Sequence, residues 1–232
     1  MSKPFFRFKQ FTVYHDLCAM KVGVDGVLLG AWADCLNSKY ILDVGTGSGL
    51  IALMMAQRSQ AVVQAIDIDE NACRQAAINF MSSPFHDRLV IELVAFQDYS
   101  PPVGFDLIVS NPPYYVNSLK SLDKKRNLAR HNDSLSLNDL LCKSASLLNP
   151  QGKVAFILPF GMCEIAHTSA IENQLFLCRK TLVSSLQNHP PKRVLLEYSL
   201  INQGTIENSI YIGESRENYS DEYRALTEDF YL

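Results

Sequence analysis

The feature that most constrains the fold is a hydrophobic run that leads directly into a glycine-rich turn. Residues 40–44 read Tyr-Ile-Leu-Asp-Val, residues 45–49 read Gly-Thr-Gly-Ser-Gly, and apolar residues at helical spacing follow from Leu50. Glycines let the backbone turn sharply and approach a ligand that a side chain would keep away. This stretch therefore predicts a buried strand, a ligand-binding turn and a helix, the unit from which doubly wound α/β sheets are built.

The rest of the chain continues this alternation of strand-like and helix-like segments. With 232 residues, of which 47% are hydrophobic, the chain suits one large domain. Strands are predicted at 61–67, 88–94, 107–109, 153–158, 175–184, 193–201 and 210–212, and helices over Val27–Trp32, after Asp69 and Ser136, and at 219–230. The strands at 175–184 and 193–201 are expected to pair antiparallel. We expect a single α/β domain with an N-terminal covering segment (1–36), a core (37–201) and a C-terminal strand and helix (202–232).

A second feature is the loop that follows the short apolar run at 107–109. It reads Asn111-Pro112-Pro113-Tyr114. Two consecutive prolines donate no backbone hydrogen bond, so they cannot continue a sheet ladder. The loop therefore stands at the carboxyl end of a strand, where open α/β sheets bind their ligands. Taken alone, the pattern also fits a proline-rich turn that has no role in chemistry.

The same four residues resemble the signature of amino-methyltransferases, which move a methyl group from S-adenosylmethionine to a nitrogen conjugated with a ring or carbonyl. Such a nitrogen is a poor nucleophile because its lone pair is delocalised. The resemblance implies that the Asn111 side chain and a proline carbonyl accept hydrogen bonds from the NH2 group, and that Tyr114 stacks on the planar substrate. Positioning and oriented acceptors would supply the catalysis. Asn111, Pro112, Pro113 and Tyr114 are the candidate catalytic residues.

The glycine turn supports this resemblance. Its spacing is Gly-x-Gly-x-Gly rather than the Gly-x-Gly-x-x-Gly of dinucleotide-binding proteins, and Asp43 precedes it on the strand. This version resembles the first motif of class I S-adenosylmethionine methyltransferases, whose fold is a Rossmann-like, seven-stranded, mostly parallel sheet flanked by helices. There the acid faces the amino end of the cofactor and the loop passes its methionine portion. The residues that this motif implies as cofactor contacts are Asp43, Gly45, Thr46, Gly47 and Gly49.

The next two strand ends supply the remaining candidates for cofactor contacts. Asp67 ends its strand 24 residues after Asp43, where an acid can bind a ribose diol through two hydrogen bonds. Ile68 follows it among the expected contacts, and Asp69 is the predicted N-cap of the next helix.

The adenine contact departs from the family pattern. Many relatives place an acid after the third strand to contact the adenine ring of the cofactor, whereas this chain has Ala95 there. Phe96 and Asp98 are the alternatives, and Asn111 is expected to touch the cofactor as well.

The first 22 residues combine positive charges with aromatic rings. The positive side chains are Lys3, Arg7, Lys9 and Lys21, and the rings are Phe5, Phe6, Phe8, Phe11 and Tyr14. One interpretation is an edge hairpin whose aromatic side chains face the core. The other is a surface that holds a polyanion through phosphate contacts and base stacking, which makes Lys3, Arg7 and Lys9 candidate RNA-binding residues.

The segment Met20-Lys-Val-Gly-Val-Asp-Gly-Val27 resembles the N-terminal region of a bacterial family that methylates N6 of adenine 37 in a valine tRNA. In that family the segment folds over the cofactor, so Lys21 and Asp25 are expected to contact S-adenosylmethionine. Asp25 is also well placed to cap the helix that follows. A purely structural cap therefore remains an alternative.

A polar segment of about 20 residues follows Tyr114, and loops of this length are uncommon unless they are functional or disordered. Its positive side chains are Lys120, Lys124, Lys125, Arg126 and Arg130, against Asp123 and Asp133. Contact with RNA phosphates is the preferred interpretation, and a solvated linker is the alternative.

Composition excludes several other classes. The net charge is −3, so nucleic-acid contacts must come from local patches. The six cysteines form no Cys-x-x-Cys pair, and none lies near a histidine at ligand spacing, so no metal site is expected. No apolar run approaches the ~18 residues of a membrane span, and no secretory signal is evident. We therefore expect a cytoplasmic protein, and separately we expect it to act as a monomer.

The resemblance implies transfer of a methyl group to N6 of an adenine in tRNA, at position 37 of a valine tRNA. Two alternatives remain. A protein-glutamine N5-methyltransferase uses the same four-residue loop, but such enzymes usually carry a helical N-terminal domain, and only about 40 residues precede the first strand here. A non-catalytic RNA-binding module with a methyltransferase fold is opposed by the intact Asp43, Gly45, Gly47, Asn111 and Tyr114. C5 methyltransferases need a cysteine nucleophile, commonly after a proline, and the chain has no Pro-Cys pair.

Overall fold

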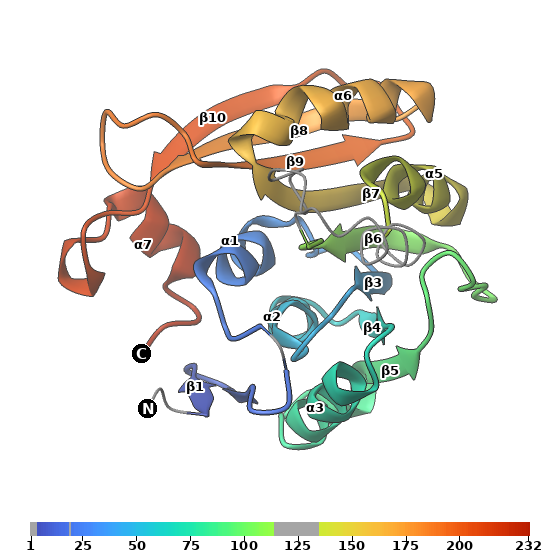
Figure 1. The fold of residues 1–232 in the computed structure, drawn as a ribbon, viewed down its shortest axis with the longest axis vertical. Helices are drawn as coiled ribbons and strands as arrows, with labels where there is room; N and C mark the ends of the chain where they lie inside the picture. Colours follow the sequence, from blue (N-terminus) through green and yellow to red (C-terminus); the bar gives the residue numbers. More distant parts are fainter. Residues whose placement is uncertain (1–3, 19, 114–134) are drawn as a thin grey trace, which may run out of the picture.

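The computed structural model describes residues 4–18, 20–113 and 135–232, and within these ranges the main sheet has eight strands (Figure 1). Their order across the sheet is β10-β8-β9-β7-β6-β3-β4-β5. The bounds are β3 Tyr40–Val44, β4 Val62–Asp67, β5 Leu89–Leu93, β6 Phe105–Ser110, β7 Leu148–Pro159, β8 Phe176–Ser184, β9 Arg193–Ser199 and β10 Ile206–Tyr211. Among them only β9 runs opposite to its neighbours, β7 and β8, which confirms the expected antiparallel pair.

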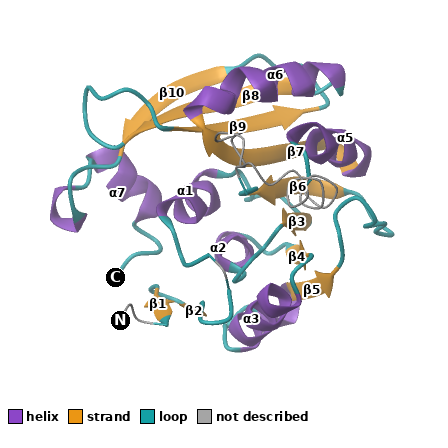
Figure 2. Ribbon diagram, viewed as in Figure 1, coloured by secondary structure: helices purple, strands orange, loops and turns teal. Residues whose placement is uncertain are grey.

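Helices cover both faces of this sheet (Figure 2). The described helices are α1 Val24–Trp32, α2 Leu50–Arg58, α3 Glu70–Met81, α5 Leu137–Leu147, α6 Cys163–Glu172 and α7 Asp221–Thr227. Neighbouring strand residues point to opposite faces, so Ile41 packs into one hydrophobic core beneath α1, α2 and α7, and Leu42 into a second core beneath α5 and α6. This is the expected α/β architecture, with apolar residues buried on both sides of nearly every central strand. No described helix is long and apolar enough to cross a membrane.

The strand count corrects the expectation of seven. The predicted short strand at 210–212 is β10, which begins at Ile206 and pairs in parallel with β8 at the edge of the sheet. Residues 206–209 are all exposed, so they present no buried face and hence no apolar alternation that would reveal a strand. The C-terminal helix is also shorter than predicted, because Phe230 folds back into the core after α7 ends.

The N-terminal residues form a separate two-stranded antiparallel sheet, β1 Phe5–Arg7 with β2 Thr12–Tyr14. Phe8 and Phe11 are buried between the strands and the body of the protein, which confirms core-facing aromatic side chains for these two residues. One of the two interpretations of this segment was a hairpin at the edge of the sheet, but the hairpin does not pair with the main sheet. Instead it lies beside the C-terminus, where the ring of Tyr231 stacks on that of Phe8 (Figure 1).

Candidate active site

The carboxyl ends of the central parallel strands bring the predicted site residues together. Val44, the last residue of β3, is paired with Ile66 of β4 on one side and with Ser110 of β6 on the other. The residues that follow these three are Gly45, Asp67 and Asn111, and they therefore emerge side by side at one edge of the sheet. The Ser110 hydroxyl donates to the carbonyl of Val44 at 2.9 Å, which fixes β6 against β3 at this edge.

The glycine loop is held to β4 through its backbone and leaves one side open. The N–H groups of Gly45 and Thr46 both donate to the carbonyl of Ile66, at 3.0 and 3.1 Å. Gly45 and Gly47 have φ values of +70° and +57°, which L side chains rarely adopt. A Cβ atom at either position would meet no other atom within 4 Å. These two glycines therefore face open space, and a ligand can approach their backbone closely.

Gly49, in contrast, is packed against helix α3. Its φ is +83°, and a Cβ atom there would lie 2.5 Å from the ring of Phe80 and 3.3 Å from Ala76, both on α3. Glycine is therefore required for the close packing of the loop on this helix. Gly49 is also the N-cap of α2, although it has no side chain with which to cap the helix.

Asp43 supplies the missing cap from the neighbouring strand. Its Oδ2 accepts hydrogen bonds from the N–H of Ala52, in the first turn of α2, at 3.1 Å and from the hydroxyl of Thr46 at 2.7 Å. One carboxylate thus fastens the loop and the start of the helix together. The other oxygen, Oδ1, is fully buried and has no hydrogen-bond partner.

Burial, with a smaller contribution from the charge of Asp67, raises the pKa of Asp43 from its ordinary value of 3.8 to about 7, although the hydrogen bonds from Thr46 and Ala52 lower it. Because Oδ1 has no hydrogen-bond partner, the negative charge of the ionised carboxylate is only partly compensated by the two bonds to Oδ2. Positive charge brought by a ligand bound at the loop would compensate it. The sequence indicated an acid at this position, but not that it would be the cap of α2.

This pKa has a consequence for stability. A carboxyl group whose pKa is higher in the folded than in the unfolded protein binds its proton more tightly when folded, so its favourable contribution is lost as the pH rises from about 4 through about 7. We expect the free energy of unfolding to fall between pH 5 and pH 8 by up to a few kcal/mol relative to Asp43→Asn, which does not titrate. Urea unfolding of both proteins across this range measures the difference. If the free energies of unfolding of the two proteins changed in parallel with pH, Asp43 would not titrate in this way.

Asp67 is oriented by the backbone around it. Its Oδ2 accepts from the N–H of Gly47 at 2.9 Å, and its Oδ1 accepts from the N–H of Asp69 at 2.9 Å. Ile68 is 63% exposed between them and offers an apolar surface at the same edge. Asp69 accepts from the N–H of Asn71 at 2.8 Å, which confirms it as the N-cap of α3.

The residues proposed for the adenine ring of the cofactor lie in different environments. Phe96 is 3% exposed and packs in the hydrophobic core beside Val44 and Ile66. Its ring therefore supports the strand ends from within and offers almost no surface to a ligand. Asp98 is exposed, in the turn after Ala95.

Asp25 is not the cap of α1. The helix begins at Val24, so its N-cap is Gly23, and Asp25 falls in the first turn, where a negative charge favours the helix dipole. Its carboxylate instead accepts from Nε of Arg193 at 2.9 Å. Arg193 is the first residue of β9 and is paired with Pro159 at the end of β7, so this ion pair lies at the same carboxyl edge. Sequence reasoning missed Arg193, because residues 168 positions apart leave no local signal.

The remaining candidates are only partly placed. Asn111 and Pro112 are half-buried and Pro113 is exposed at the end of β6, and Lys21 is exposed before α1. Arg7 is exposed on β1, whereas the amine of Lys9 donates to the carbonyl of Glu228 at 2.5 Å. Candidates that lie outside the described residues are Lys3, Tyr114, Lys120, Lys124, Lys125, Arg126 and Arg130.

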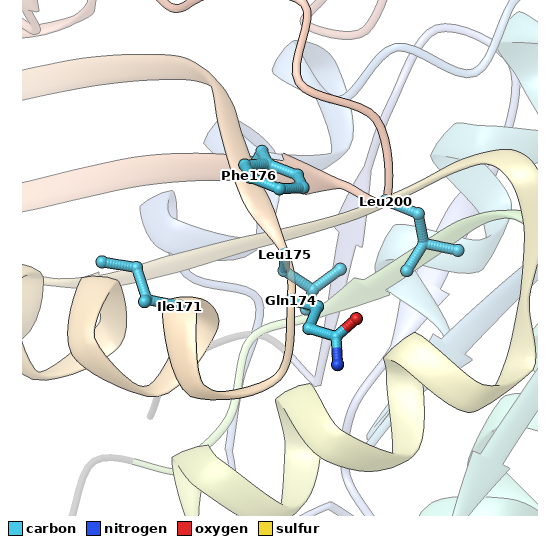
Figure 3. A pocket seen from close by; sticks show the side chains of 5 residues that line it. All are labelled: Ile171, Gln174, Leu175, Phe176 and Leu200. Carbon is cyan, nitrogen blue, oxygen red and sulfur yellow. The ribbon is translucent and has the colours of Figure 1, made fainter.

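Two other observations concern the rest of the described chain. Residues 4–18, 20–113 and 135–232 contain no group of three His, Cys, Asp or Glu side chains that could hold a metal ion. A hollow of about 460 Å³ is lined by Ile171, Gln174, Leu175, Phe176 and Leu200 (Figure 3). Phe176 begins β8, which runs parallel to β7, so this hollow lies at the amino edge of the sheet, opposite the glycine loop. It is therefore not part of the candidate site.

Comparisons with known proteins agree with this geometry. The family model of the methyltransferase small domain matches residues 27–159. A tRNA1(Val) (adenine(37)-N6)-methyltransferase from Parabacteroides distasonis is 51% identical over 235 residues, covering 100% of this chain and 99% of the relative. A protein of the same name from Phocaeicola vulgatus is 47% identical over 232 residues, with the same coverage.

Solved structures support the fold independently. The crystal structure of a predicted O-methyltransferase from Agrobacterium tumefaciens has a TM-score of 0.70 to this chain and covers 89% of it, with 96% of its own length matched. Its 14% identity makes this a likeness of fold alone. Together, the class I methyltransferase fold and the full-length relatives show that the chain belongs to the family of tRNA1(Val) (adenine(37)-N6)-methyltransferases.

Proposed function

We propose that this protein transfers a methyl group from S-adenosylmethionine to N6 of adenine 37 in tRNA1(Val), acting as a monomer in the cytoplasm. The observation that supports this function best is the register of β3, β4 and β6, which aligns the glycine loop, Asp67 and the Asn111 loop at one edge. Full-length relatives carrying this name support the choice of substrate.

The residues at this edge fit S-adenosylmethionine. The unpartnered oxygen of Asp43 favours a ligand with positive charge, which the cofactor carries on its ammonium and sulfonium groups. The open sides of Gly45 and Gly47 admit a chain close to the backbone, and the carboxylate of Asp67 suits a ribose diol. We assign Thr46, Gly49, Lys21, Asp25, Ile68, Phe96 and Asn111 to the surroundings of the same site. When bound, the cofactor supplies an electrophilic methyl group.

The chain itself contributes orientation. The side-chain oxygen of Asn111 and the carbonyl of Pro112 accept hydrogen bonds from the adenine amine, so that its lone pair is directed out of the plane of the ring. Pro113 stiffens the loop, and Tyr114 stacks on the base, which must leave the anticodon-loop stack to reach the site. No strong base is required, because oriented acceptors stabilise the charge that develops on the nitrogen.

The positive side chains that we propose for tRNA binding are Lys120, Lys124, Lys125, Arg126 and Arg130, with Lys3, Arg7 and Lys9 of the N-terminal segment. Replacing Lys124, Lys125 and Arg126 together by alanine should weaken tRNA binding and reduce its dependence on salt by roughly one unit of slope per lost phosphate contact. Binding measured at several salt concentrations gives this slope. Arg74→Ala, which removes an exposed charge paired with Glu70 on α3, is the matched control and should leave the slope unchanged. If the salt dependence of tRNA binding were the same in the triple variant as in the wild type, the segment would be a solvated linker instead.

Nucleoside mass spectrometry of tRNA from a strain that lacks the gene tests the proposed function. N6-methyladenosine should be missing from its valine tRNA and return when the wild-type gene is restored. Persistence of this nucleoside in the deleted strain would overturn the assignment.

A further inference from the structure

Helix α3 carries two buried amide side chains, Gln75 and Asn79, one turn apart on the same face. They are 1% and 0% exposed. A buried amide is costly unless its donors and acceptors are satisfied. The side-chain oxygens of both accept from backbone of the N-terminal segment: the N–H of Leu17 donates to Gln75 at 3.0 Å, and the N–H of Tyr14 donates to Asn79 at 2.9 Å. The two amides therefore seat residues 14–17 along α3.

Asn79 makes two further bonds that Gln75 does not. Its amide nitrogen donates to the carbonyl of Tyr14 at 2.8 Å and to the carbonyl of Ser48 at 2.8 Å. Ser48 lies inside the glycine loop, between Gly47, which donates to Asp67, and Gly49, which packs on Phe80. One fully buried side chain thus joins the N-terminal segment to the loop proposed for the cofactor.

Beyond these hydrogen bonds to α3, the next residue of the N-terminal segment comes close to the end of β4. Cys18 follows Leu17 in this segment, and its thiol interacts with the carboxylates of Asp67, the last residue of β4, and Asp69; burial, together with these charges, raises the pKa of the thiol to about 11. Cys18 of the segment therefore lies near the proposed ribose-binding residue.

We propose that Asn79 is a positioning residue that couples the N-terminal segment to the glycine loop, so that cofactor binding and the seating of residues 14–17 stabilise each other. The inference rests on the cofactor site of the proposed function and adds a residue to it. Coupling of this kind is reciprocal: whatever holds the segment favours the loop geometry that binds the cofactor, and the bound cofactor holds the segment.

Asn79→Ala and its control Gln75→Ala separate coupling from simple anchoring. Asn79→Ala loses two bonds to the N-terminal segment and Gln75→Ala loses one, but only Asn79→Ala also releases Ser48. We expect the KM for S-adenosylmethionine to rise about tenfold in Asn79→Ala, with kcat at saturating cofactor and the KM for tRNA nearly unchanged. Gln75→Ala should raise the cofactor KM far less. Equal cofactor KM values in the two variants and the wild type would overturn the proposal.

Hydrogen exchange on the wild-type protein tests the coupling without any variant. Saturating S-adenosylhomocysteine should slow exchange of the Tyr14 amide, which is bonded to Asn79, more than that of the Phe8 amide, which is bonded to Phe11 within the same hairpin. If the product binds and Tyr14 exchange does not change, the role of Asn79 is wrong while the proposed function stands. If the wild-type protein binds neither product nor cofactor, the proposed function fails, and this inference fails with it.

Discussion

Replacing Asn111 with alanine should lower kcat by about 10²-fold or more while tRNA affinity changes little. The loss of one oriented polar group in a catalytic site has effects of this size. Asn111 would strengthen its contact with the amine as charge develops on the nitrogen, so its benefit belongs mainly to the transition state. Steady-state kinetics at saturating cofactor and tRNA, together with tRNA binding, measure the two quantities separately.

Asn149→Ala provides the matched control for this variant. Asn149 donates to Asp106 at 2.7 Å on β6, the strand that ends at Asn111. Removing it disturbs the same strand without touching the proposed acceptors, so kcat should stay within a few-fold of the wild type. Wild-type turnover by Asn111→Ala would contradict the mechanism, and an equal loss in both variants would point to damage to β6 instead.

Gly49→Ala should destabilise the protein by about 2–5 kcal/mol. A non-glycine residue in the left-handed region costs roughly 1–2 kcal/mol, and forcing an atom into a packed site costs roughly 1–3 kcal/mol more. The added Cβ would lie 2.5 Å from the ring of Phe80, which is itself buried. Urea unfolding gives the change in the free energy of unfolding.

Gly45→Ala separates these two contributions. Its φ is +70°, but a Cβ atom there meets nothing within 4 Å, so only the backbone cost of roughly 1–2 kcal/mol should appear. Combining Gly49→Ala with Phe80→Leu should cost less than the sum of the single changes, because the smaller side chain relieves the contact. Equal losses in Gly45→Ala and Gly49→Ala would show that the packing on α3 is not tight.

The parts of the site that were predictable from the sequence are those with a local cause. A hydrophobic strand, a glycine turn and a helix are contiguous, so 40–58 could be assigned directly. Asp69 caps its helix as predicted, and Ser136 caps the helix that was predicted to follow it, because an N-cap bonds to an N–H group only two or three residues away. Parallel strands that alternate with helices also predict which strand ends meet at one edge.

The parts that were missed depend on residues far apart in the chain. The ion pair of Asp25 with Arg193 needs β9 to lie next to β7, and the bonds of Asn79 need the N-terminal segment to run along α3. Neither arrangement leaves a periodic pattern in the sequence. The predicted range of the edge strand β10 was too short for a related reason. Its residues 206–209 are exposed on both faces, so they show no apolar alternation.

The central claim is that the Asn111 loop methylates N6 of adenine 37 in tRNA, and an assay with purified components tests it most directly. The protein is incubated with S-adenosylmethionine and a tRNA1(Val) transcript, and the product is digested and examined by mass spectrometry. We predict about one methyl group per transcript, on N6 of adenine 37, and none on a transcript with guanine at that position. Methylation of a protein glutamine instead, or no methyl transfer to the adenine-37 transcript by a protein that binds the cofactor, would contradict the account.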